Sequence, residues 1–404
     1  MATRRLYYDD PFQDNFTAQV LSCRPFADPI AGFGDSLWGV ILDQTHLYPA
    51  SGGQPNDLGK LGEANVVDVR ALDNDEILHV VDRPVGTGRV EGCVHWPRRF
   101  DHMQQHTGQH LLSAVFQERF GLPTISFHLG ESVSTIDLSG HQPSPQILEG
   151  AARAANAVVF EDREVTVRYG TADEFARVGV RKQVERSGIL RAIEIAGIDL
   201  QPCGGTHVRR TGQIGLILLR GCSKIRQDWR VEFVCGGRAE TAARKDSEIL
   251  TSAASRLKCA AADLYYGLER LLQEREAASK SFKNLLPRLA ELEAASTLSS
   301  AELCPDGTRL ISATLEDAAT TEYLQHYATA LTRSEKVVAL LALKESGSLL
   351  FAQNPNPARD MQALLKKALE QFGGKGGGTK DFARGALATP ANASAALDFA
   401  KSLL

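Results

Sequence analysis

HTGQH at residues 106–110 and CGGTH at residues 203–207 decide how this chain can fold and what chemistry it can carry. Each stretch places two metal-binding side chains four positions apart, and together they supply three imidazoles and one thiolate, from His106, His110, Cys203 and His207. Imidazole nitrogens combined with one thiolate suit Zn²⁺. We therefore predict one metal site that joins two segments far apart in the sequence.

The first histidine pair lies in a stretch with the pattern of a helix. Asp101 suits an N-cap with Gln104 three residues later, apolar residues recur through 111–116, and Gly121 suits the C-terminal end. Positions i and i+4 share one helical face about 6 Å apart, so both imidazoles can reach one ion. The second pair flanks two glycines, whose missing side chains let the backbone fold tightly around a metal.

The ligand count leaves two kinds of zinc site open. Four protein ligands are typical of a closed structural site, whereas catalytic zinc keeps a position open. A catalytic role would need one weak or displaced ligand, or expansion to five ligands. The helix lacks the glutamate of the HExxH motif, which excludes the metalloprotease form of such a pair.

Composition indicates an ordinary globular protein. The chain has 404 residues, enough for two or three domains, with 43% hydrophobic and 23% charged residues. No apolar run approaches the ~20 residues of a membrane span, and the N-terminus lacks the apolar region of a signal peptide. Seven cysteines without regular spacing do not suggest disulfides. We expect a cytoplasmic protein without a membrane partner, and the net charge of −4 gives no global attraction to nucleic acid.

The predicted fold class is multidomain α+β, with four domains. Residues 1–95 alternate short β-like runs with turns, which is typical of a small barrel or sandwich, and we expect an N-terminal β-barrel. Residues 96–238 are predicted to form the α+β core that holds the zinc site, with helices on a largely antiparallel sheet. A seven-residue leucine repeat in 239–297 predicts a helical or coiled-coil segment, which Pro287 breaks or kinks. Residues 298–404 suit a small α/β domain.

The last domain contains GGKGGGTK at residues 373–380, which we expect to be a loop that opens a helix over 381–387. No P-loop register fits it. Backbone N–H groups of such a loop can bind an anion, and Lys375, Lys380 and Arg384 would strengthen phosphate binding; a flexible loop is the alternative. Basic residues that include Arg209 and Arg210 also cluster beside the second metal motif, as a phosphate-binding patch or as a solvated strand face.

The two metal motifs, with TGQIG at 211–215, resemble the editing domain of alanyl-tRNA synthetases. They are still more similar to the free-standing AlaX-type alanyl-tRNA editing proteins. YPASGGQPND at 48–57 resembles the glycine-rich motif of that family, although Ala50-Ser51 stands where another glycine is common. SFHLG at 126–130 also fits.

The stretch 373–378 is similar to the C-terminal domain of alanyl-tRNA synthetase, which in that family grips tRNA and supports dimers. The resemblance therefore covers nearly the whole chain and indicates the long form of these proteins. The chain begins at the barrel and leaves no room for a class II aminoacylation domain, so we expect neither ATP use nor amino-acid activation.

The resemblance implies hydrolysis of the ester that joins a wrong amino acid to tRNA(Ala), chiefly serine, with glycine left open. It assigns one Zn²⁺ per chain to His106, His110, Cys203 and His207. His128 is the expected catalytic residue, orienting water or the substrate amine; a plain surface or core histidine is the alternative. The expected substrate-binding residues are Gln54, Gly52, Gly53, Thr107, Thr124 and Ser126.

The expected tRNA contacts are Arg209, Arg210, Lys375, Lys380 and Arg384. A homodimer through the helical and C-terminal regions is a further expectation, although packing of the helix onto the chain's own domains would explain the leucine repeat equally well. Two alternative functions stay open at this point. One is a tRNA-binding protein with structural zinc, and the other is a metallohydrolase for a different aminoacyl ester.

Overall fold

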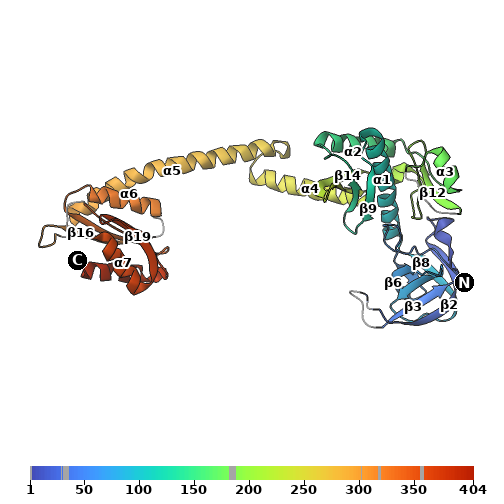
Figure 1. Ribbon diagram of the computed structural model, residues 1–404, viewed down its shortest axis with the longest axis horizontal. Helices are drawn as coiled ribbons and strands as arrows, with labels where there is room; N and C mark the ends of the chain where they lie inside the picture. The colour runs from blue at the N-terminus through green and yellow to red at the C-terminus, as the bar shows by residue number, and fades with distance from the viewer. Residues whose placement is uncertain are drawn as a thin grey trace. The chain divides into compact units, whose positions relative to one another are not determined.

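The computed structural model describes residues 2–28, 30, 36–181, 188–301, 303–316, 320–354 and 359–404. Two compact units make up the chain: unit 1 ends at Leu250 and unit 2 begins at Thr251 (Figure 1). The predicted multidomain α+β class, with an N-terminal barrel and a C-terminal sheet-and-helix domain, is confirmed. The finer division into four domains stays a prediction.

Unit 1 begins with a closed six-stranded barrel in the order β2-β3-β7-β6-β5-β8. Alternate residues of β2, namely Phe16, Ala18 and Val20, are buried in its core, as expected for strands with one face inward. The strands lie within residues 1–95, where short β-like runs were predicted. They are β2 (Asn15–Phe26), β3 (Leu37–Leu42), β5 (Gly59–Leu61), β6 (Ala64–Ala71), β7 (Ile77–Val81) and β8 (Gly88–Val94), with the short parallel pair β1 (Arg4–Arg5) and β4 (Gln44–Thr45) beside them.

The second part of unit 1 is built from two antiparallel sheets and three helices. The larger sheet has the order β14-β15-β10-β9, and the smaller has the order β11-β12-β13. Its elements are α1 (Trp96–Phe120), β9 (Thr124–Leu129), β10 (Ser134–Leu138), α2 (Pro145–Phe160), β11 (Val165–Gly170), α3 (Ala172–Val178), β12 (Leu190–Ile195), β13 (Asp199–Pro202), β14 (Ile217–Ile225) and β15 (Asp228–Cys235).

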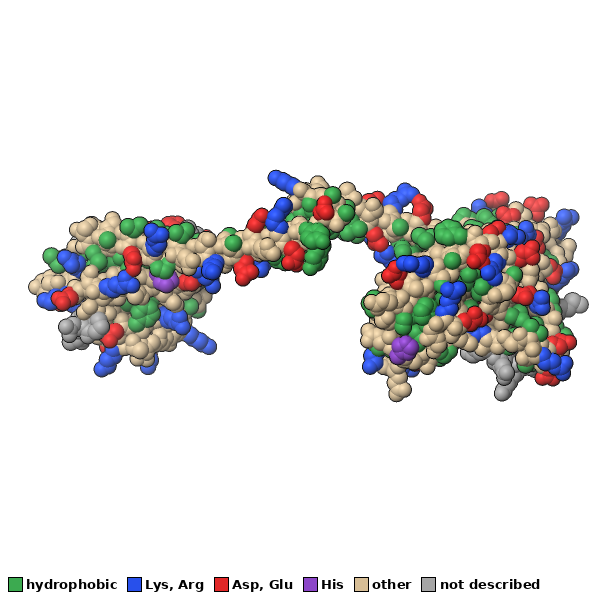
Figure 2. Space-filling model, turned by 90° about the horizontal axis from the view of Figure 1, so that it is seen from above, with side chains coloured by type: hydrophobic (Ala, Val, Ile, Leu, Met, Phe, Trp, Pro, Cys, Tyr) green, Lys and Arg blue, Asp and Glu red, His purple; other side chains and the backbone are tan. Residues whose placement is uncertain are grey.

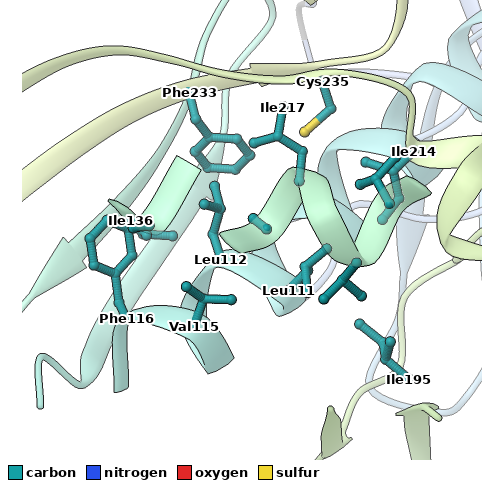
Figure 3. Packing of buried hydrophobic residues seen from close by; sticks show 14 of the residues in the cluster. Leu111, Leu112, Val115, Phe116, Ile136, Ile195, Ile214, Ile217, Phe233 and Cys235 are labelled. Atoms are coloured by element: carbon teal, nitrogen blue, oxygen red, sulfur yellow. The ribbon is translucent and has the colours of Figure 1, made fainter. Parts of the chain in front are cut away.

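Helix α1 lies at the centre of this part and is buried over most of its length. Leu111, Leu112 and Phe116 pack with Ile136 and Phe233 of the larger sheet in one apolar cluster (Figure 3). Burial of such side chains contributes about 1.5–3 kcal/mol each. This packing holds α1 against the sheet and so sets the positions of His106 and His110, which α1 carries.

The predicted start of this helix was wrong. Asp101 is not an N-cap but lies inside α1, where its carboxylate forms an ion pair with Arg238. The helix begins five residues earlier, at Trp96, with Pro97 in its first turn, where proline needs no hydrogen-bond partner for its nitrogen. The predicted end is confirmed, because Gly121 adopts the left-handed conformation with φ 65°.

A buried arginine joins α1 to the barrel part of the chain. Arg99 is fully buried, and its guanidinium pairs with Asp57, also buried. It donates as well to the carbonyls of Pro11 and His46. Asp57 in turn accepts a hydrogen bond from the backbone N–H of Tyr48, 2.7 Å away. The turn that follows Tyr48 is therefore held against the first turn of the helix that carries the histidines.

Unit 2 contains a long helix and a five-stranded sheet in the order β16-β17-β18-β20-β19. Helix α4 (Gly237–Arg256) precedes α5 (Leu264–Ser300), and α5 continues through Pro287, so a break at that residue is excluded while a kink there stays a prediction. The remaining elements are β16 (Arg309–Leu315), α6 (Thr321–Thr332), β17 (Val337–Leu343), β18 (Ser348–Gln353), α7 (Met361–Phe372), β19 (Gly374–Gly378), β20 (Phe382–Leu387) and α8 (Ala393–Ser402). Short 3₁₀ turns, η1 (Leu6–Tyr8), η2 (Thr211–Ile214), η3 (Ala261–Asp263) and η4 (Pro390–Asn392), complete the described structure.

The glycine-rich stretch is a strand rather than a helix-opening loop. Residues 374–378 pair antiparallel with 383–387, where a helix was expected. Ala383 and Leu387 are buried and Arg384 and Ala386 are exposed, as the two faces of a strand require. A short apolar run does not distinguish helix from strand, which explains the error.

Many apolar side chains of α5 are exposed, among them Leu268, Leu271, Phe282, Leu285, Leu289 and Leu292. They follow the leucine repeat of the sequence, and the homodimer expected from that repeat stays a prediction. Among the described residues, no helix combines the length and the apolarity that crossing a membrane requires.

We predict that Arg99→Met lowers the free energy of unfolding of unit 1 by about 3–5 kcal/mol, because the substitution leaves the Asp57 carboxylate buried without its partner. Urea unfolding followed by tryptophan fluorescence measures this, since all three tryptophans, Trp38, Trp96 and Trp229, lie in unit 1. The control is Arg98→Met, at a half-buried neighbour that donates to one carbonyl, with an expected loss of about 1 kcal/mol. Equal losses for the two variants would contradict the prediction.

Candidate metal centre

The four predicted ligands come together in unit 1. One donor atom from each of His106, His110, Cys203 and His207 lies within 4.8 Å of the others. The Cys203 Sγ lies 3.4 Å from His106 Nε2 and 3.3 Å from His207 Nε2. Zinc bonds of about 2.0 Å to nitrogen and 2.3 Å to sulfur give tetrahedral edges of about 3.5 Å. The two sulfur-to-nitrogen edges therefore have the length that a tetrahedral metal site requires.

Hydrogen bonds at the far side of each ring fix which nitrogen faces the centre. His106 Nδ1 donates to Gln54 Oε1 at 2.9 Å, and His110 Nδ1 donates to Asp199 Oδ2 at 3.2 Å. The hydroxyl of Thr107 gives its proton to the carbonyl of Met103, so His207 Nδ1 is the donor to Thr107 Oγ1, at 3.1 Å. Each ring therefore turns its Nε2 toward the centre, where this nitrogen can bind a metal once it carries no proton, as outer hydrogen bonds arrange in metal sites generally.

The electrostatics of the cluster favour the metal-binding forms of two ligands. Burial would raise the pKa of the Cys203 thiol, but the charges of His106 and His207 outweigh it and hold this pKa well below its usual value. Burial and the charge of His106 lower the pKa of His207 to about 3. A thiolate and a neutral imidazole are the forms that coordinate metals.

His110 differs from the other rings. Burial alone would lower its pKa, yet hydrogen bonds to Asp199 and Cys203 raise the pKa to about 9. Metal binding must therefore displace a proton from His110.

The turn between Cys203 and His207 depends on its glycines and on one arginine. A Cβ atom on Gly205 would lie 2.2 Å from the His106 ring, so only glycine allows this approach. Arg191 Nη1 donates to the carbonyls of Cys203 and Gly205, at 2.7 and 3.0 Å. The Arg191 guanidinium also lies over the Tyr8 ring, 5.0 Å from its centroid.

The glycine-rich turn of the barrel part forms a second wall of the site. Gly53 has φ +84°, and a Cβ there would lie 2.7 Å from the Phe127 ring. Its carbonyl accepts a hydrogen bond from the N–H of Leu129 in the strand β9. Phe127 in turn lies 5.6 Å from the His106 ring, centroid to centroid. The turn is thereby positioned beside the metal ligands.

A cavity of about 330 Å³ opens beside the cluster. Three ligands, His106, His110 and Cys203, contribute to its lining. The other lining residues come from the barrel turn, from α1, from β9, from the segment after α3 and from the residues around Cys203. They include Tyr48, Gly52, Gln109, Thr124, Ser126, Arg181 and Gly204. A metal ion held by the cluster would therefore border a space of ligand-pocket size.

The structure brings some of the predicted substrate-binding residues to this cavity and keeps others behind the ligands. Gly52, Thr124 and Ser126 line it. Gln54 is buried, with its amide bonded to Thr206 and His106. Thr107 is buried behind His207.

His128, the predicted catalytic residue, has an exposed side chain in β9 and is not among the residues that line the cavity.

Three residues of the site escaped the sequence analysis. Asp199, which orients His110, stands only four positions before Cys203, and Arg181 pairs with it at 3.0 Å. Gln109 lies directly before His110 in the helical motif and was passed over. Sequence proximity to the ligands was the available signal for Asp199 and Gln109, whereas nothing in the sequence singled out Arg181.

The predicted tRNA contacts divide into two groups. Arg209 pairs with Asp10 and Arg210 with Asp162, so both charges are partly neutralised. Figure 2 likewise shows basic and acidic side chains interspersed over unit 1. In unit 2 the side chains of Lys375, Lys380 and Arg384 are exposed, and Lys375 and Arg384 line a common hollow beside the glycine-rich strand.

We predict that Asp199→Asn lowers the affinity for Zn²⁺ about 10–100-fold, because His110 loses the carboxylate that orients its ring and increases its basicity. Competition with a chromophoric chelator measures the dissociation constant. Asp173→Asn, at an exposed carboxylate in α3, is the matched control and should leave it unchanged. An unchanged affinity in Asp199→Asn would show that this carboxylate does not support the centre.

Comparisons with known proteins agree with this geometry. Residues 190–232 match the family "Threonyl and Alanyl tRNA synthetase second additional domain", and residues 307–404 match the DHHA1 domain. The alanyl-tRNA editing protein AlaX-L of Pyrococcus horikoshii is 30% identical over 403 residues, which cover 94% of each chain. The mouse alanyl-tRNA editing protein Aarsd1 is 30% identical over 92% of this chain and 91% of its own.

A longer relative is the alanine–tRNA ligase of Pyrococcus abyssi. It is 30% identical over all of this chain, which spans 44% of the ligase. The matches to AlaX-L and Aarsd1, by contrast, extend over nearly the whole of both partners. With a metal-ligand cluster beside a cavity and this end-to-end similarity, the chain belongs to the alanyl-tRNA editing protein family.

Proposed function

We propose that this protein is an aminoacyl-tRNA hydrolase that acts in trans on mischarged tRNA(Ala) and removes serine. Glycine is the second amino acid to test. The observation that carries the proposal is the cluster of three imidazoles and one thiolate at the wall of a cavity of about 330 Å³. Membership of the alanyl-tRNA editing proteins supports the same conclusion.

We propose Zn²⁺ as the metal, held by His106, His110, Cys203 and His207, one ion per chain. When bound, it would supply Lewis acidity that polarises an ester carbonyl or lowers the pKa of water. Asp199, Gln54 and Thr107 would keep the three rings in the orientation that binding requires. We therefore propose that Gln54 and Thr107 position the metal ligands and do not contact the substrate.

A purely structural zinc is the competing function, because four protein ligands are typical of closed sites. The lining of the cavity favours catalysis: His106, His110 and Cys203 all border it, so the cluster is not sealed from a ligand. The hydroxyls of Thr124 and Ser126 border the same space and are proposed to contact the aminoacyl group. The role of His128 in orienting water stays a prediction, for which its exposed position offers no support.

The selection for serine has a physical basis. A pocket for alanine discriminates against an added hydroxyl only by about a hundredfold, as a valine site does against threonine. A site that hydrogen-bonds the hydroxyl can discriminate by roughly 10⁴, because alanine would leave buried polar groups unpaired. Hydrolysis consumes water and no ATP, so the proposed reaction needs no activation step.

For tRNA binding we propose the exposed basic residues of unit 2, Lys375, Lys380 and Arg384. They stand on and beside the glycine-rich edge strand β19, which the DHHA1 match includes. Phosphates bind such cations with release of counterions. Arg209 and Arg210 are the weaker candidates, since each is already paired with a carboxylate.

We predict that the purified protein deacylates Ser-tRNA(Ala) and spares Ala-tRNA(Ala). Cys203→Ala should lower the rate at least about a hundredfold. Loss of a residue that only hydrogen-bonds to a metal ligand already costs up to about a hundredfold, and Cys203 would be a ligand itself. Chelation should have the same effect and added Zn²⁺ should reverse it. Cys222→Ala, at a half-buried cysteine in β14, is the control and should keep full activity.

Two outcomes would contradict the proposed function. If chelation lowers the unfolding temperature and no aminoacyl-tRNA is cleaved by the metal-loaded protein, the zinc is structural. If another amino acid on the same tRNA is cleaved faster than serine, the enzyme is a hydrolase of different specificity.

We predict further that Lys375→Ala and Arg384→Ala each reduce the slope of log K against log salt concentration for tRNA binding by about 0.7–0.9. Filter binding at several salt concentrations measures the slope. Lys401→Ala, at an exposed lysine in α8 of the same unit, should leave the slope unchanged. If all three variants have the wild-type slope, tRNA does not contact Lys375 or Arg384.

A further inference from the structure

Gln109 is the one polar residue of the HTGQH motif at 106–110 to which the proposed function gives no role. It stands directly before His110, is 3% exposed and lines the cavity. Its Nε2 donates to the Ser113 hydroxyl at 2.9 Å. Its Oε1 is withdrawn from solvent and has no hydrogen-bond partner within the part of the chain that the structure describes.

An acceptor left unpaired in such a position is costly. A buried polar atom without a partner loses its hydration and gains nothing in return, so nearly all such atoms in native proteins are paired. Ser113 does not relieve this cost, because its oxygen lies against Gln109 Nε2 rather than Oε1 and accepts hydrogen bonds there and, at 2.8 Å, from Thr124 Oγ1. Gln109 lines the cavity, so a small rotation of its amide would bring Oε1 within reach of a donor on a molecule bound there.

Two groups of a seryl ester carry suitable protons: the α-ammonium and the side-chain hydroxyl. The described part of the cavity lining contains the guanidinium of Arg181 and the neutral side chains of Gln109 and Thr124, but no Asp or Glu. Burying an ammonium there without a carboxylate partner costs more than burying a hydroxyl. A hydroxyl also both donates and accepts. A hydroxyl can therefore hydrogen-bond to the glutamine amide whether the amide oxygen or the amide nitrogen faces the cavity. An ammonium group can hydrogen-bond only to the oxygen.

We propose that Gln109 is a specificity-determining residue that recognises the side-chain hydroxyl of the aminoacyl group. The inference rests on the proposed function for the identity of the ester and deepens it by naming the group that tells serine from alanine. Bound serine pairs the orphan oxygen, and bound alanine leaves it buried and unpaired. Such a difference is the kind that discriminates well between a substrate and its analogue without a hydroxyl.

The test measures binding, so that it stays separate from turnover. The probes are 3′-deoxy-3′-(L-seryl)aminoadenosine and its L-alanyl counterpart, whose amide bonds replace the scissile ester. Isothermal titration calorimetry on the zinc-loaded full chain should give about tenfold tighter binding of the seryl compound, the value of one neutral hydrogen bond at the upper end of its range. Gln109→Met, which keeps the length of the side chain, should abolish this preference by weakening only the seryl compound.

Two further variants serve as controls for the Gln109→Met result. Gln109→Asn withdraws the amide by one methylene and should lose the preference in the same way, which covers the case in which the methionine variant folds poorly. Gln117→Met, at a half-exposed position two turns along α1 and outside the cavity lining, should behave as the wild-type protein. Bound zinc and the unfolding temperature should match the wild type in every variant used.

Each result has a definite meaning. An equal loss of affinity for the seryl and alanyl compounds would overturn the inference, since Gln109 would then bind a group that both share. A wild-type protein without preference for the seryl compound would overturn it too. If the preference depends on Gln109 while Ser-tRNA(Ala) stays intact in the presence of the enzyme, the inference stands and the proposed function falls.

Discussion

The structure of unit 1 depends on one constraint: three imidazoles and a thiolate must keep their lone pairs turned toward a common point. Groups of this kind repel one another unless a cation lies between them, so their convergence has to be enforced from outside. Gln54, Asp199 and Thr107 enforce it by accepting the proton on the far side of each ring. The resulting Sγ–Nε2 distances of 3.3 and 3.4 Å match the edges of a tetrahedral site.

The architecture around the centre serves this convergence. The helix α1 is fixed by apolar packing on one sheet, and Arg99 ties its first turn to Asp57 and to the turn after Tyr48. That turn delivers Gln54 to the back of His106 and Gly52 to the cavity. The barrel is therefore part of the site, because it supplies both an orienting partner and a wall.

The metal ligands could be predicted from sequence, because their residue types and their spacing of four positions, on a helix and in a glycine turn, are typical of a metal site. The barrel strands were predictable from alternation. The hydrogen-bond partners of the imidazole rings could not be predicted, because aspartate and threonine are common residue types. Only the three-dimensional structure shows that Asp199 and Thr107 lie beside the histidines. Asp101 had the chemistry of an N-cap, yet Pro97 and the ion pair with Arg238 put it inside the helix. The strand at 382–387 was mistaken for a helix because six residues are too few to distinguish the two periods.

The proposed function requires one metal ion that all four side chains hold at once. X-ray absorption spectroscopy at the zinc edge, on full-length protein containing one equivalent of Zn²⁺, identifies the atoms bound to it. We expect a first shell of three nitrogens at about 2.0 Å and one sulfur at about 2.3 Å. A shell without sulfur, or one with oxygen in place of an imidazole nitrogen in the ligand-free protein, would contradict it.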